Sequence, residues 1–169
     1  MADDIQSIYA TALKNAHAVE LEALQIMGRQ VERLQRYPEM ERILRRHIDE
    51  THQQRDRLEA AMSAINESPS ALKEGVMGMM GNLAALAHTP AQDEILKNTF
   101  ANHAFENFEI AVYKSLLVIT DAAGQSRFLP GFETSLREEQ TMAKDVAELI
   151  DPTTRRYIEL TTSGAAASH

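Results

Sequence analysis

Acidic residues interrupt the apolar faces that this sequence would present as helices. In the segment 132–150, apolar residues recur in alternating steps of four and three, and Glu139 takes one position of that series. Glu20 takes an equivalent place between Ala16 and Ala23. Because residues spaced by three and four share one face of a helix, we expect both carboxylates to point into the protein.

Two further segments show the same interruption. One series with helical spacing includes His47, Glu50 and Gln54. The other is expected to run through six inward residues, which are Phe100, His103, Glu106, Ile110, Tyr113 and Leu117. Each predicted long helix therefore offers one inward glutamate near its centre, and these are Glu20, Glu50, Glu106 and Glu139.

Carboxylates buried together repel one another unless they are protonated or neutralised by cations. Two divalent ions would balance the four negative charges, as in carboxylate-bridged di-iron and di-manganese bundles. The chain has no cysteine, so a metal here must be held by carboxylate and imidazole groups. Such oxygen-rich sites suit iron and manganese more than copper. The pattern therefore predicts a site for two metal ions.

Three histidines each precede a glutamate by three residues, so that each pair shares a helix face. Their order is the reverse of the Glu-x-x-His motif of many di-iron bundles. For His17 and His103, a surface ion pair is the alternative to a role at the metal. His47 is flanked by inward positions, which favours a ligand role.

Composition predicts an all-α protein without nucleic-acid or membrane partners. The chain of 169 residues is rich in helix-forming residues and has only 7 glycines and 5 prolines. Its formal net charge of −8 disfavours nucleic acid and anionic membranes and favours cations. The N-terminal sequence lacks the pattern of a signal peptide, and no stretch reaches membrane-spanning length. We therefore expect a cytoplasmic protein.

Periodicity predicts four long helices, at about 4–37, 39–66, 90–123 and 130–150. The link in the middle is long, and we expect it to contain a helical crossover over 70–88. Asp151 and Pro152 are expected to end the fourth long helix, before a short C-terminal helix over 153–160. Short outer links and a long middle link are typical of ferritin-like four-helix bundles. Residues 1–160 would form one such domain, and 161–169 a flexible tail.

The sequence resembles the YciE/YciF-type ferritin-like stress proteins over nearly its whole length up to about Ile150. The matching segments are 47–51 with Gln54, then 57–59, 106–113 and 136–139. The resemblance implies a bundle related in shape to the rubrerythrins, often dimeric and associated with bacterial stress responses. By matching position it marks six candidate metal ligands, Glu20, His47, Glu50, Glu106, Glu109 and Glu139, of which Glu109 comes from the resemblance alone.

Two functions remain open from the sequence. The first is a stress-response protein that holds two iron (or manganese) ions, oxidises Fe(II) with oxygen or peroxide, and forms a homodimer. The alternative is a non-enzymatic dimeric stress or interaction module with a degenerate metal site. The alternative is favoured by Gln53 and Met142, which stand where di-iron bundles have histidines three residues after Glu50 and Glu139. A hollow iron-storage shell would need a cage-forming surface that the sequence does not identify.

Overall fold

The computed structural model describes residues 2–68 and 92–168, and this part of the chain is almost entirely helical. The long helices are α1 (Ala2–Val31), α2 (Pro38–Ser63), α4 (Glu94–Ala122) and α5 (Leu129–Thr162), and the short 3-10 helix η2 (Ser126–Phe128) precedes α5. Within the described residues there is no strand. The all-α prediction is confirmed.

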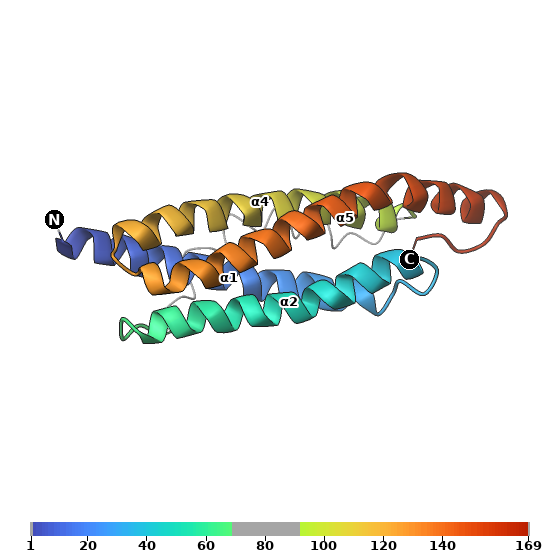
Figure 1. Cartoon of the computed structure of the whole chain (residues 1–169). Coiled ribbons are helices and arrows are strands. Elements are labelled where there is room, and N and C mark those ends of the chain that lie inside the picture. The colour runs from blue at the N-terminus through green and yellow to red at the C-terminus, as the bar shows by residue number, and fades with distance from the viewer. Residues whose placement is uncertain (1, 69–91, 169) are drawn as a thin grey trace.

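The four long helices lie side by side as an antiparallel bundle (Figure 1). α1 packs against α2 and α4, and α5 packs against the same two helices. α2 ends at one end of the bundle, whereas α4 begins at the other (Figure 1). This is the connectivity of ferritin-like bundles, so the predicted fold class is confirmed. The crossover that we expect over 70–88 lies outside the described residues.

The first helix ends earlier than its apolar pattern indicates. α1 stops at Val31, and two turns follow, in which Arg33 N donates to Gln30 O and Tyr37 N donates to Leu34 O. Leu34 and Tyr37 are nevertheless buried. Both residues fit the apolar spacing of the helix although they belong to the turns after it. The spacing therefore predicts a helix that extends to residue 37.

The prediction that Asp151 and Pro152 end the fourth helix is wrong. α5 continues through Pro152 to Thr162, so the expected short C-terminal helix is the last part of α5. Pro152 is exposed, whereas Thr153 and Leu160 beyond it are buried. Burial of these side chains at the end of the bundle offsets the backbone hydrogen bond that proline cannot make.

The C-terminal segment, which the sequence predicts to be flexible, lies against the end of the bundle. The hydroxyl of Tyr37 donates to Ala167 O at 2.6 Å, and Ile95 N donates to Ser168 O at 2.9 Å. Ala167 is buried with the core. The second of these bonds satisfies a backbone donor in the first turn of α4, where no partner exists within the helix. None of the described helices is apolar over a length that would cross a bilayer.

Candidate metal centre

The apolar core consists of two clusters separated by a polar layer. One cluster surrounds Met27, Ile43 and Val146, and the other surrounds Leu13, Leu58 and Phe132. Every helix of the bundle contributes a buried ionisable side chain between them, and these side chains are Glu20, His47, Glu106, Glu109 and Glu139. Placing charged groups at the centre of a bundle is costly, so the layer requires a compensating interaction.

Four of these side chains converge. His47 from α2, Glu106 and Glu109 from α4 and Glu139 from α5 each place one possible ligand atom within 4.8 Å of the others. All four are at most 3% exposed. One nitrogen and three carboxylate groups around a shared point form a donor set that suits iron or manganese.

His47 lies at the middle of the group. Its Nε2 is 3.2 Å from Oε2 of Glu106 and 3.2 Å from Oε2 of Glu139. Both distances are within the range of a salt bridge, but the geometry does not make either contact a hydrogen bond. On the other side of the ring, Nδ1 is 2.9 Å from Oε2 of Glu50. A proton on Nδ1 donated to Glu50 would leave the Nε2 lone pair directed at the carboxylates, as in histidines that bind metals.

The carboxylates around His47 are mostly without hydrogen-bond partners. Both oxygens of Glu109 and Glu139 are buried and unpartnered, and so are Oε2 of Glu20 and Oε2 of Glu106. Native proteins rarely leave buried polar atoms unsatisfied, and a bound ion is one ordinary explanation. The residues present therefore fit a metal centre.

Burial and mutual repulsion shift the pKa values of the group. Burial raises the pKa of Glu20 and that of Glu109, and the neighbouring Glu139 raises both further. Burial also raises the pKa of Glu139 to about 7, although His47 opposes this shift. Burial alone would lower the pKa of His47, but Glu106, followed by Glu139 and Glu50, raises it overall. Without metal, protons are shared within the cluster.

Glu20, the predicted ligand from α1, lies beside the group of four and is held by a tyrosine. The buried hydroxyl of Tyr113 donates a short hydrogen bond to Oε1 of Glu20. The sequence placed Tyr113 on the inward face, seven residues after Glu106, but did not assign it this contact. A tyrosine two turns from an inward glutamate on the same helix face is the available sequence signal.

Glu50, the predicted ligand from α2, turns toward the edge of the layer. Its side chain is 24% exposed and lies 3.4 Å from Nε of Arg46, in addition to its contact with His47. Arg46 in turn pairs with Asp145 of α5 at 2.7 Å. The structure thus brings Glu50 to the far side of the His47 ring and not into the group of four.

The inward face of α4 differs from the predicted one. Phe100, expected inside, is 54% exposed, and Ile110 is only half-buried. The buried face instead passes through Asn102, Glu106 and Glu109. Ile110 also lies four residues after Glu106, so its spacing and apolar character favour burial, although it is only half-buried.

The other two histidines of the His-x-x-Glu pairs lie apart from the centre. Nε2 of His17 is 2.9 Å from Oε1 of Glu59, so His17 forms a hydrogen bond between α1 and α2. This partner differs from Glu20, three residues on. His103 is half-buried, and its Nδ1 has no hydrogen-bond partner.

The fold and this layer define a ferritin-like helical bundle with a carboxylate-rich centre. The family described as "Domain of unknown function (DUF892)" matches residues 4–159, and the chain belongs to this family. The resemblance to the YciE/YciF-type proteins is thereby confirmed.

Solved structures of bacterial proteins share the fold. A protein of Xanthomonas campestris pv. campestris is 26% identical with a TM-score of 0.78, and the match covers 94% of this chain and 99% of that one. The Escherichia coli stress protein YciF is 18% identical with a TM-score of 0.73, over 86% and 94% of the two chains. YcfI of Rhodopseudomonas palustris is 19% identical with a TM-score of 0.71, over 85% and 92%.

Proposed function

We propose that this chain is a bacterial stress-response protein that holds a carboxylate-rich di-metal centre, with iron as the metal, and oxidises Fe(II) with oxygen or peroxide. The observation that supports the proposal is the buried group of His47, Glu106, Glu109 and Glu139, whose carboxylate oxygens are largely unpartnered. The stress role is suggested by YciF, which is described as a stress protein.

Each residue has a separate part in the proposed site. Nε2 of His47 and the carboxylates of Glu106, Glu109 and Glu139 are the proposed ligands. Glu50 holds the His47 ring by Nδ1, and Tyr113 holds Glu20 at the edge of the layer. The two apolar clusters keep bulk water away from the centre. When bound, the metal ions supply the electrons that reduce the oxidant.

The test is metal analysis and Fe(II) oxidation with matched glutamine variants. Protein from iron- or manganese-supplemented cells should carry metal, and Glu109→Gln and Glu139→Gln should lose both metal and oxidation rate. Glu133→Gln is the control, because Glu133 is an exposed carboxylate on the same helix as Glu139. Equal oxidation rates for the wild type and all three variants would overturn the proposal.

A specific observation favours the alternative, a metal-free stress or interaction module. The raised pKa values of Glu20, Glu109 and Glu139 mean that protons can neutralise the layer, with His47 as an internal cation. Such a layer would be a hydrogen-bonded network in place of a metal centre.

Calorimetric titration with Mn(II) in two buffers of different ionisation enthalpy separates the two functions. A metal centre must release protons as the ions bind, because the ligands have to be deprotonated. The heat would then depend on the buffer. A module without a metal site would give no saturable heat in either buffer.

A homodimer in the cytoplasm completes the proposal. Large apolar side chains on the surface, including Leu21, Phe100 and Val118, offer area for association with a second copy. Light scattering coupled to gel filtration would measure the mass directly, against 18.9 kDa for one chain. A cage-forming assembly would instead elute as a far larger particle.

A further inference from the structure

A line of buried polar side chains on α4 connects one end of the bundle with the candidate metal centre. Its members follow one another at intervals of four residues, and they are Glu94, Asn98, Asn102 and Glu106. They are 8%, 7%, 4% and 3% exposed in that order. Because a helix rises about 1.5 Å per residue, this polar file extends roughly 18 Å along α4.

The outer end of the file is closed by an ion pair. Arg33, which follows α1, places NH1 3.0 Å from Oε1 of Glu94 and donates from NH2 to Oε2 at 3.0 Å. The Arg33 side chain is 48% exposed, whereas that of Glu94 is 10% exposed. The pair is therefore reachable from solvent on the arginine side, whereas the carboxylate of Glu94 is largely buried.

The middle of the file is formed by amide groups. Asn102 and Gln30 of α1 exchange two hydrogen bonds, of 2.8 Å and 3.2 Å. The pair of Asn102 and Gln30 can be explained as a contact that fixes α1 against α4. The burial of Asn98 has no such explanation, because its side-chain carbonyl oxygen has no hydrogen-bond partner. An unpartnered carbonyl oxygen between two carboxylates is suited to a passing or bound cation.

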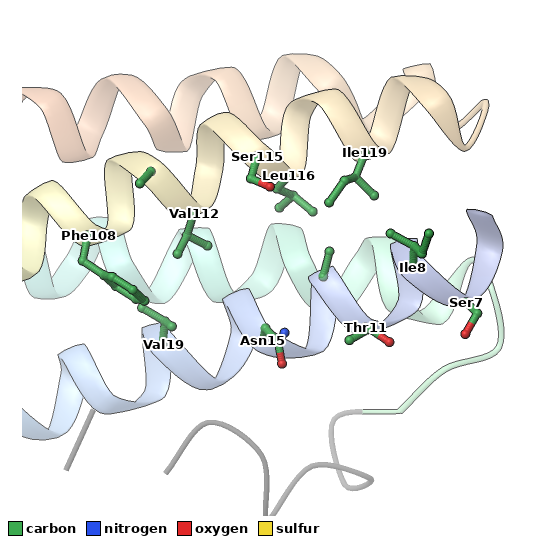
Figure 2. A pocket seen from close by; sticks show the side chains of 12 residues that line it. Ser7, Ile8, Thr11, Asn15, Val19, Phe108, Val112, Ser115, Leu116 and Ile119 are labelled. Carbon is green, nitrogen blue, oxygen red and sulfur yellow. The ribbon is translucent and has the colours of Figure 1, made fainter. Parts of the chain in front are cut away.

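The other approach to the layer from the α1–α4 side is apolar. A groove of about 660 Å³ lies between these helices, from Ile8 and Ile119 at one end to Val19 and Phe108 at the other (Figure 2). Among the residues that the structure describes, no ionisable side chain lines it. Its polar side chains are uncharged and include Thr11, Asn15 and Ser115, so a divalent cation would lose its hydration shell there without meeting a carboxylate.

We propose that divalent cations reach the metal centre along the polar file from Glu94 to Glu106, and that Arg33 guards its entrance. This inference rests on the proposed metal-binding function. Carboxylate and amide oxygens replace hydration water at successive turns, and an arriving cation competes with the guanidinium of Arg33 for Glu94. The first three members of the file thus form a loading route that ends at the proposed ligand Glu106.

The test follows loading of the metal-free protein with Co(II) by stopped-flow visible absorption, and release of the ion to a chelator. Asn98→Leu and Asn102→Leu should each slow both rates by about tenfold, the effect expected when one buried polar partner is lost. The affinity should not change, because a route alters entry and exit equally. Arg33→Ala should speed both rates.

Asn15→Leu is the matched control. It makes the same amide-to-leucine change in the apolar groove and should leave both rates unchanged. If the Asn98→Leu variant had the wild-type rates and an unchanged melting temperature, the proposal that cations enter along the polar file would be overturned. Slowing by Asn15→Leu instead would assign the route to the groove. If wild-type protein binds no Co(II), the proposed function fails together with this inference, an outcome distinct from binding at equal rates.

Discussion

At the scale of single residues, Glu139 is a carboxylate that folding removes from water. It is fully buried between His47, Glu106 and Glu109. Burial raises its pKa from 4.5 to about 7. In the unfolded chain the same group ionises near its ordinary value, so folding and protonation are linked.

The sign of this linkage follows from the direction of the shift. Folded protein binds the Glu139 proton more tightly than unfolded protein, so the contribution of Glu139 to metal-free stability is fully present below about pH 4.5 and is lost as pH rises through about 7. The pKa of His47 is also raised, so its contribution is present below its ordinary value of 6.5 and is lost at higher pH. Because of both groups, the free energy of unfolding decreases as pH rises through the neutral range.

We predict that Glu139→Gln removes the part of this loss that comes from Glu139. Glutamine keeps the uncharged form at every pH, so the variant should exceed wild type by roughly 3 kcal/mol at pH 8 and match it at about pH 4. Urea unfolding in EDTA at several pH values measures the difference. Glu133→Gln, at an exposed site, should retain the wild-type profile. Parallel profiles for wild type and Glu139→Gln would contradict the buried-carboxylate explanation.

Glu50 provides a second prediction, because its contact is with the histidine ring. Glu50→Gln weakens the acceptor at Nδ1 of His47 without removing a proposed ligand. Affinity for Co(II) should fall by about 10- to 100-fold, the usual cost of losing such a supporting contact. Asp49→Asn, an exposed neighbour on α2, is the control. An unchanged affinity in equilibrium titration would show that Glu50 does not orient the ring.

Much of the candidate site could be predicted because an inward carboxylate breaks an apolar series visibly. Glu20 and Glu139 stand alone among apolar neighbours at helical spacing, and both are buried. Glu109 could not be found in this way, because Ile110 beside it fits the same spacing. A position one residue away turns by about 100° on a helix, so spacing alone does not choose between them. The outward turn of Glu50 depends on Arg46, whose placement sequence spacing does not determine.

At the scale of elements, Pro152 shows where local preference and tertiary packing disagree. Proline lacks the N–H that would bond to the carbonyl of Glu148, and its ring crowds that carbonyl, so the sequence predicts a break. α5 nevertheless continues, because Thr153 and Leu160 become buried. The helix should therefore retain the local cost of the proline.

We predict that Pro152→Ala raises the free energy of unfolding by up to about 3 kcal/mol, since alanine restores the hydrogen bond and removes the steric contact. Pro38→Ala is a control of opposite sign. Pro38 is the first residue of α2, where a proline is already preorganised, so this change should lower stability slightly. Urea unfolding of the two variants measures both effects. No gain for Pro152→Ala would mean that α5 bends there at little cost.

The four long helices were predictable in their order because their apolar spacing is sustained over many turns. The end at Gly124 was also predictable, since Gly124 has a φ of +70° just after α4, where other residues are strained. The end of α1 and the continuation of α5 were not predictable. Both depend on which side chains the rest of the bundle buries, and a local pattern does not contain that information.

At the scale of the whole molecule, the polar layer divides the core, and every helix of the bundle meets there. The interactions that bridge this layer from the outside include the bidentate pair of Arg57 with Glu138 and the pair of Arg46 with Asp145. A metal ion bound by His47, Glu106 and Glu139 would join α2, α4 and α5 through the centre. Metal binding should therefore stabilise the bundle as a unit.

We predict that saturating Mn(II) or Fe(II) under argon raises the melting temperature, whereas EDTA returns it to the metal-free value. A ligand that binds only the folded state at a hundred times its Kd adds about 2.7 kcal/mol, which for a chain of this size is a shift of roughly 5–10 °C. The shift should grow from pH 6 to pH 8. The metal displaces protons from its ligands, and fewer protons are bound to them at higher pH.

The double variant Glu109→Gln with Glu139→Gln separates this linkage from nonspecific binding of cations. Its net charge remains strongly negative, so ions that merely collect around an acidic surface would still raise its melting temperature. A site built from the buried carboxylates would not, and the variant should melt at one temperature with or without metal. If metal raised the melting temperatures of the wild type and the double variant equally, the bound ions would lie on the surface. The charges of the polar layer would then be neutralised by protons and not by metal.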